Sequence, residues 1–131
     1  MKKRLVIIVC ILAAGMFIFR TQRPYKDLAP SDITSATVHL SPPDKTIQIT
    51  ETEIEGLVPY LKEITIYHKD DSYYEYNGQA VTFTLSMTDG SKETIVAYAP
   101  FVVIDGTGYK AKYAPCEGLN NYANKLLHAQ R

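Results

Sequence analysis

Residues 79–98, QAVTFTLSMTDGSKETIVAY, decide the fold class. Apolar and polar side chains alternate through the first half of this stretch, which is typical of a strand that buries one face. The side chains predicted to face a core are Val81, Phe83, Leu85 and Met87, and those predicted to face away are Thr82, Thr84, Ser86 and Thr88. Asp89-Gly90 is a favoured pair for a tight turn, and residues 95–98 return as a second strand. The stretch therefore predicts an antiparallel hairpin.

The neighbouring segments repeat this hairpin pattern on both sides. Residues 101–104 (FVVI) and 109–113 (YKAKY) flank a glycine-containing turn at 105–108, which predicts another hairpin. Upstream, apolar and polar residues alternate over 36–40 and, after a proline-rich break, again over 47–49. We therefore expect a strand pair near the start of the domain and a meander of about four or five strands later in the chain.

The segment TETEIEGLVPYLKEI, residues 50–64, has the apolar spacing of a helix. Thr50 and Glu53 stand at the spacing of a capping box, which marks a helix start. Gly56 and Pro59 are poor helix residues, so a short or bent helix is expected.

A closing amphipathic helix is expected over residues 117–130. Its apolar face is formed by Leu119, Tyr122, Ala123, Leu126 and Leu127. The order strand, strand, helix, meander, helix predicts an α+β domain, in which a single antiparallel sheet carries two helices packed on one face.

An apolar segment precedes the domain. Residues 5–19, LVIIVCILAAGMFIF, contain no charge and have basic residues on both sides, which is typical of a targeting segment. As a helix this run would be roughly 22 Å long, a short membrane span that flanking basic side chains can complete. Because the run continues past the small residues at 13–15, an uncleaved transmembrane anchor is favoured over a cleaved signal. Cys10 lacks the small neighbours that a lipoprotein site requires.

These features divide the chain into three parts. Residues 1–23 are predicted to be a signal anchor, residues 24–32 a tether, and residues 33–131 an extracytoplasmic domain. The predicted location is the cell membrane with a single pass, and secretion after signal cleavage is the alternative.

Charge and cysteine content narrow the classes of function. Five of the fourteen basic residues lie within residues 1–23, so the remainder carries nine basic and fourteen acidic residues, a formal net charge of −5. Nucleic-acid-binding proteins are expected to carry the opposite sign, so no nucleic acid is expected as a partner. Because Cys10 lies in the apolar run, Cys116 has no disulfide partner within the domain and is expected to be a small buried residue.

Motifs for catalysis are weak in this chain. Residues 102–108, VVIDGTG, are similar to the catalytic turn of aspartic peptidases, but Gly106 separates Asp105 from the Thr-Gly pair and no second motif completes a dyad. A hairpin turn explains the same residues. Residues 68–71, HKDD, lack the oxygen-rich spacing of a calcium loop, and the sequence contains neither His-Glu-x-x-His nor Gly-x-Ser-x-Gly. We therefore expect no catalytic residue, no metal and no cofactor.

Tyrosine is the unusual feature of the composition, with ten tyrosines, four phenylalanines and no tryptophan. Four of the tyrosines lie within YHKDDSYYEYNG, residues 67–78. Tyrosine offers a large contact area with a polar tip at low rotamer cost, which suits recognition surfaces. The hypothesis is a partner-binding loop over residues 68–78 with the contact residues Tyr73, Tyr74, Tyr76, Asp70 and Asp71. The alternative is that strand-favouring tyrosines simply border the sheet.

Two segments resemble known proteins. SPPDKTIQI at residues 41–49 and PFVVIDGTGYKAKYAPCEGLNNYANKLL at residues 100–127 resemble small anchored proteins of clostridia-like Gram-positive bacteria, and are similar to extracytoplasmic tails of BlaR1-type membrane sensor peptidases. The resemblance spans most of residues 24–127. It implies a cell-envelope location and a sensory or regulatory setting. It transfers no catalytic residue, because the peptidase part with its zinc motif is absent from this sequence.

These observations predict a non-catalytic, membrane-anchored extracytoplasmic module with a binding or regulatory role. Its expected partner is a protein, a peptide or another component of the cell envelope, and its expected contact with the membrane is made by residues 5–19. Two alternatives stay open: a secreted inhibitor of an extracellular enzyme, and a small hydrolase whose site leaves no motif. A cavity lined by converging polar side chains would favour the hydrolase, whereas a tyrosine-rich surface would favour the binding module.

Overall fold

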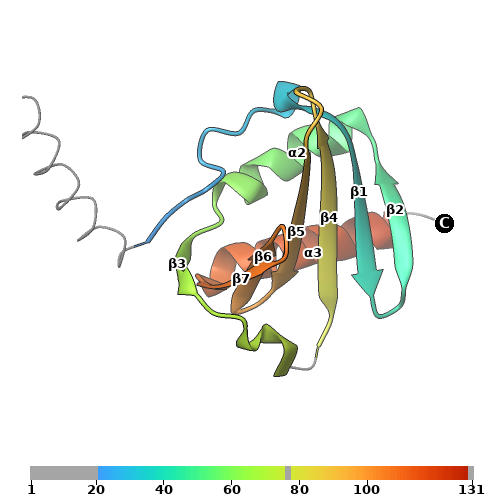
Figure 1. The fold of residues 1–131 in the computed structure, drawn as a ribbon. Helices are drawn as coiled ribbons and strands as arrows, with labels where there is room; N and C mark the ends of the chain where they lie inside the picture. Colours follow the sequence, from blue (N-terminus) through green and yellow to red (C-terminus); the bar gives the residue numbers. More distant parts are fainter. Residues whose placement is uncertain (1–20, 76–77, 130–131) are drawn as a thin grey trace, which may run out of the picture.

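Figure 1 shows a computed structural model of the chain, in which residues 21–75 and 78–129 are described. Within these residues, seven strands form one antiparallel sheet in the order β2-β1-β4-β5-β6-β7-β3. The bounds are β1 (Ile33–Ser41), β2 (Lys45–Ile49), β3 (Ile66–Lys69), β4 (Ala80–Met87), β5 (Lys92–Tyr98), β6 (Phe101–Ile104) and β7 (Thr107–Ala111). The predicted α+β class and single antiparallel sheet are confirmed.

Two α-helices, α2 (Glu51–Lys62) and α3 (Tyr113–Ala129), lie against the same face of this sheet (Figure 1). Two short 3-10 helices, η1 (Pro30–Asp32) and η2 (Ser72–Glu75), precede β1 and β4. The closing helix begins at Tyr113, four residues before its predicted start. Pro115 is compatible with this start. Proline lacks a backbone N–H, but the N–H groups in the first turn of a helix have no intrahelical acceptor, so no hydrogen bond is lost.

The strand side chains that point toward the helices are the ones that the apolar alternation predicts to be buried. Phe83 and Leu85 on β4 are fully buried, and they share one apolar cluster with Leu57 of α2 and Leu119 of α3. Met87, at the end of β4, is only partly buried against this cluster. The burial of one apolar stripe from each element therefore holds the sheet and the helices together.

The start of α2 and its central glycine both have a structural explanation. Thr50 and Glu53 form the predicted capping box, with the Glu53 N–H 3.2 Å from Thr50 Oγ1 and the Thr50 N–H 2.9 Å from Glu53 Oε1. A Cβ at Gly56 would lie 2.7 Å from the hydroxyl of Tyr122 on α3, which donates a hydrogen bond to the Glu53 carbonyl at 2.7 Å. Gly56 thus lets the two helices approach closely.

The prediction of a loop over residues 68–78 is wrong at its first two residues, which belong to a strand. Residues 66–69 form β3, which pairs with β7 at the edge of the sheet. Only Ile66 of this strand is buried, so the segment has no apolar alternation that would reveal a strand in the sequence. The hairpin over VVIDGTG is confirmed, because Asp105 and Gly106 form a two-residue turn with φ values of 48° and 87°.

The segment before the domain lies against it. Gln22 and Ile66 exchange two backbone hydrogen bonds of 2.8 Å, the guanidinium of Arg23 donates to the Lys62 carbonyl, and Tyr25 is 7% exposed. Residues 24–32, predicted as a tether, therefore contact the domain; their role as a link to an anchor stays a prediction. The predicted anchor at residues 5–19 lies outside the described residues, and in the part of the chain that is described no helix is long and apolar enough to cross a membrane.

Candidate functional site

The sheet face opposite the helices is here called the open face, and residues 21–75 and 78–129 cover it at one end only. Cross-strand neighbours share a face, and the row across β4, β5, β6 and β7 on the open face consists of Thr82, Val96, Val103 and Gly108. Thr82 is partly exposed, whereas Val103 is 4% exposed although it lies outside the helix-side core. A segment other than the helices must therefore cover the β6–β7 end of this face.

Residues 70–73 provide this cover. The Asp70 N–H donates to the Gly108 carbonyl at 2.9 Å, and the Gly108 N–H donates to Asp71 Oδ1 at 2.9 Å. A Cβ at Gly108 would lie 2.6 Å from the Asp70 carbonyl oxygen and 2.8 Å from the ring of Tyr73. The Tyr73 ring thus packs on the backbone of β7, and only glycine at position 108 leaves room for it.

The two predicted acidic contact residues hold this segment in place. Asp71 accepts the hydrogen bond from Gly108, and Asp70 Oδ1 accepts from the N–H and the hydroxyl of Ser72 at 2.9 and 2.7 Å. The two hydrogen bonds from Ser72 are the main cause that lowers the pKa of Asp70. Both carboxylates have partners within the domain, so the segment is shaped before any ligand arrives.

The predicted contact tyrosines fall into different environments. Tyr73 is partly buried on β7, whereas Tyr74 is 75% exposed, and their rings meet edge to face with centroids 6.1 Å apart. Tyr76 lies outside the described residues. Tyr73 therefore has a packing role that Tyr74 lacks, although the two are adjacent in the sequence.

A small cavity opens where this segment leads into β4. It has a volume of about 210 Å³ and lies at the end of the sheet where β5 turns into β6 and α3 begins. Its lining residues are Gly78, Gln79, Tyr98, Ala99, Tyr113, Glu117 and Asn120. Tyr113 is 58% exposed, and its interaction with Glu117 is the main cause that raises the pKa of the Tyr113 hydroxyl.

An amide network fixes one wall of this cavity. Gln79 Oε1 accepts from the side-chain amides of Asn120 at 3.0 Å and Asn124 at 2.7 Å, while Gln79 Nε2 donates to the Pro42 carbonyl at 2.9 Å. The network joins α3 to the start of β4 and to the β1–β2 turn, so the wall is rigid. No pattern in the sequence predicts this set of residues, because Gln79, Tyr98 and Asn120 come together only through the tertiary fold.

The described lining residues of this cavity carry groups that can form hydrogen bonds with a ligand. Its lining residues offer phenol, amide and carboxylate groups, but no serine, cysteine or histidine that a neighbouring base could activate. Cys116, in the first turn of α3, is buried, its thiol donates to the Phe101 carbonyl at 3.6 Å, and desolvation raises its pKa to about 11. The predicted small buried cysteine is confirmed, and its thiol is unsuited to act as a nucleophile.

The aspartate of the VVIDGTG motif, Asp105, links the β6–β7 turn to β5. Asp105 Oδ1 accepts a hydrogen bond from the Thr94 N–H at 2.8 Å. Burial, and then its interaction with Asp105, raise the pKa of Glu93, which also accepts a hydrogen bond of 3.3 Å from the Tyr25 hydroxyl. Neither carboxylate lines the cavity beside Tyr113. Among residues 21–75 and 78–129, no cluster of three or more His, Cys, Asp or Glu side chains is arranged to hold a metal ion.

Comparisons with models of known protein families, with curated proteins and with solved structures found no match.

Proposed function

We propose that this chain is a non-catalytic binding module that recognises a protein or peptide of the cell envelope through the tyrosine-bearing end of the domain. This surface consists of Tyr74, Tyr113 and the cavity between Gln79, Tyr98 and Asn120. In this proposal residues 5–19 anchor the chain in the membrane and the domain lies outside the cytoplasm, as the apolar run and its basic flanks suggest.

The observation that carries the proposal is the exposure of Tyr74 on a segment that is otherwise tied down. Its neighbours Asp70, Asp71 and Tyr73 are used in hydrogen bonds and packing within the domain. A large aromatic side chain that is 75% exposed contributes little to folding, and a partner could bury it without first ordering the segment. Tyr113 is exposed beside the cavity and adds a second aromatic contact with a polar tip.

The test is capture of a partner by the full chain, tagged at its C-terminus and extracted from its native envelope in a mild detergent. The double variant Y74S/Y113S should change the free energy of unfolding by less than about 0.5 kcal/mol, because both side chains are exposed. It should nevertheless lose the proteins or peptides that the wild-type chain enriches. The matched control is D27N/E63Q, which changes two exposed side chains that do not line the cavity and should keep the partner.

Two results would contradict the proposal. A folded Y74S/Y113S variant that captures the same partner in the same amount would place the contact surface elsewhere. A wild-type chain that enriches nothing over a tag-only control would remove the basis for a binding module.

A further inference from the structure

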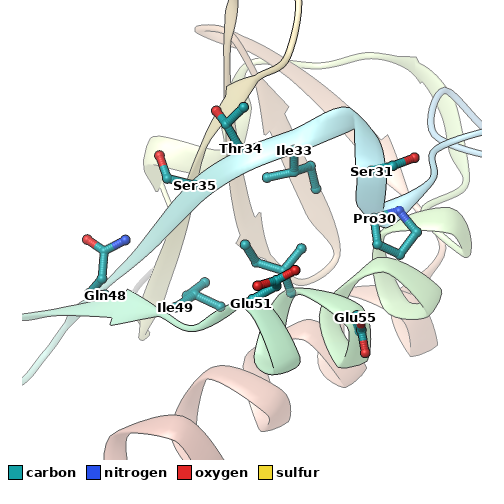
Figure 2. A pocket seen from close by; sticks show the side chains of 10 residues that line it. Pro30, Ser31, Ile33, Thr34, Ser35, Gln48, Ile49, Glu51 and Glu55 are labelled. Carbon is teal, nitrogen blue, oxygen red and sulfur yellow. The ribbon is translucent and has the colours of Figure 1, made fainter.

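A second and larger hollow lies at the opposite end of the sheet, between β1 and the first turns of α2. It has a volume of about 650 Å³, within the range of ligand-binding clefts. Its lining residues are Pro30, Ser31, Ile33, Thr34, Ser35, Gln48, Ile49, Glu51, Ile54 and Glu55. Figure 2 shows β1 on one side of this groove and α2 on the other, with η1 at one end and the last residues of β2 at the other end.

The edge of β1 that borders the groove has no strand beside it. β2 ends at Ile49, which pairs with Ala36, whereas β1 continues to Ile33 and pairs there only with β4. Among the described strands, none pairs with the β2-side edge of residues 33–35. Because a strand rises about 3.3 Å per residue, the free edge is roughly 10 Å long.

The exposure of this stretch agrees with a free edge. The pairing of β1 with β4 is irregular between Ile33 and Ser35, and Thr34 and Ser35 are both exposed, which breaks the alternation seen along the rest of β1. The Thr34 hydroxyl donates to the Ser86 carbonyl at 2.8 Å and so turns toward β4, away from the groove. Bulges of this kind are frequent where a strand edge is adapted for a function or protected from pairing.

The opposite wall of the groove is acidic. Glu51 and Glu55 are exposed on α2, and among the described residues the ten that line the groove include no lysine, arginine or histidine. The two glutamates are four residues apart, so they lie on the same side of the helix, where like charges destabilise it slightly. A cationic group in the groove would relieve this repulsion. Ile49, which Figure 2 shows between the walls, and Ile54 also line the groove; both are largely buried in the core, so they offer only a small apolar floor to the methylene stem of a long basic side chain.

We propose that this groove binds an extended peptide with basic side chains, which adds to β1 as a short strand beyond the end of β2. Main-chain hydrogen bonds to the free edge at residues 33–35 would hold the peptide. One basic side chain would face Glu51 in the groove, and another would have to reach over α2 to Glu55, which Figure 2 shows directed away from β1. This site lies apart from the tyrosine-bearing end of the domain and does not depend on the function proposed for that end.

The probe is a labelled short peptide of alternating lysine and threonine, titrated against the full chain in a non-ionic detergent. Lysines on one side of the extended peptide can face α2, while threonines face solvent. E51Q/E55Q should weaken binding about fivefold, in line with the loss of two exposed ion pairs. The matched control, D27N/E63Q, removes two exposed carboxylates outside the groove and should leave the affinity unchanged.

The geometry of strand addition is tested with N-methylated probes. An extended peptide pairs through the N–H groups of alternate residues, so methylation on the paired edge should abolish binding, whereas methylation on the other edge should leave the affinity within about twofold. E55K should also weaken binding of the lysine peptide and strengthen binding of a matched glutamate peptide. In the wild-type chain, hydrogen exchange at residues 33–35 should slow when the lysine peptide is bound.

Several outcomes would overturn the proposal. Equal loss of binding from both methylation patterns would exclude strand addition, and an unchanged affinity of a folded E51Q/E55Q variant would exclude the acidic wall as a contact. No binding of the probe to the wild-type chain would mean that the bulge protects this edge. Self-association that involves residues 33–35 and that the peptide fails to displace would make the groove a contact between two copies of the chain. The Y74S/Y113S variant should bind the probe like wild type, so this test and the capture experiment can fail independently.

Discussion

The two faces of the sheet are built from the same strands but are stabilised differently. On the helix side, apolar residues from β1, β4 and β5 share one cluster with both helices, and Val81, Phe83 and Leu85 are fully buried. On the open face, threonine and serine of β4 are partly exposed, and within the described part of the chain only the β6–β7 end is covered, by a segment of a few residues. Most of the apolar burial therefore stabilises one face, and the open face is available for contacts.

The cover on the open face also differs in kind from the helices. The helices bury apolar stripes, whereas residues 70–73 are attached through two backbone-directed hydrogen bonds and one partly buried ring. Such a cover buries less apolar surface than the helices do, so it should add less to the stability of the domain. The difference predicts that substitutions on the two faces have effects of very different size.

The largest expected effect comes from the helix side. Phe83→Ala should lower the free energy of unfolding by about 3–5 kcal/mol, because it leaves a cavity in the core shared by β4 and both helices. The matched substitution on the other face, Thr84→Ala, should cost less than about 1 kcal/mol, since Thr84 is partly exposed. Chemical unfolding of the full chain measures both values. Similar losses of unfolding free energy in the two variants would mean that both faces of the sheet contribute equally to stability. The proposed contrast between the two faces would then be wrong.

A smaller loss is expected from filling the contact between β7 and its cover. Gly108→Ala places a Cβ against the Asp70 carbonyl and the Tyr73 ring, so the segment must shift at a cost of about 1–3 kcal/mol. The matched control is Gly118→Ala in α3, where the nearest atom would be a ring carbon of Tyr60 at 3.2 Å. In a helix, alanine also has the better propensity, so this control should be neutral or slightly stabilising.

Truncation of Tyr73 separates the two contacts at Gly108. In a Tyr73→Ala background the Gly108→Ala cost should fall but not vanish, because the Asp70 carbonyl remains. Thermal unfolding and hydrogen exchange of residues 70–73 would follow this coupling. A Gly108→Ala variant with unchanged stability and unchanged protection of the segment would show that the cover lifts freely, and Tyr73 would then lose its packing role.

The helix side could be predicted from the sequence because its signals are local. The alternation over residues 81–87 and the capping box at Thr50 each specify an element and the direction of its side chains within a few residues. Even the early start of α3 has a local signal, since Cys116, Leu119 and Ala123 continue one buried stripe at helical spacing.

The open face could not be predicted in the same way, because its structure depends on pairs that are distant in the sequence. β3 exists through its pairing with β7, and Gly108 resembles a turn residue until Tyr73 is seen to pack on it. The tyrosine-rich stretch predicts a contact surface in this region, which stays a prediction, and its composition cannot separate the packed Tyr73 from the exposed Tyr74. The cavity beside Tyr113 and the free edge of β1 likewise arise only when separate elements meet.

The smallest predicted effect concerns Glu93, which lies on β5 where the helix side meets water. Burial is the main cause that raises the pKa of Glu93, followed by its interaction with Asp105. A raised pKa in the folded state means that the contribution of Glu93 is fully present below the ordinary carboxyl pKa and is lost as the pH rises through the folded-state value. Glu93→Gln cannot ionise, so it should be more stable than wild type at neutral pH.

The gain from Glu93→Gln should stay well under about 1 kcal/mol, because Glu93 is only partly buried and water screens its interaction with Asp105. Unfolding measured between neutral pH and about pH 3 should show the difference from wild type shrinking as Glu93 becomes protonated. Asp105→Asn should give a gain of the same sign, since asparagine tolerates the positive φ and can still accept from the Thr94 N–H. The stability gain of the double variant should be smaller than the sum of the two single gains, because each substitution removes the same repulsion between Glu93 and Asp105. A gain that persists unchanged at low pH would instead indicate better packing of the amide against Tyr25, and the electrostatic explanation would be wrong.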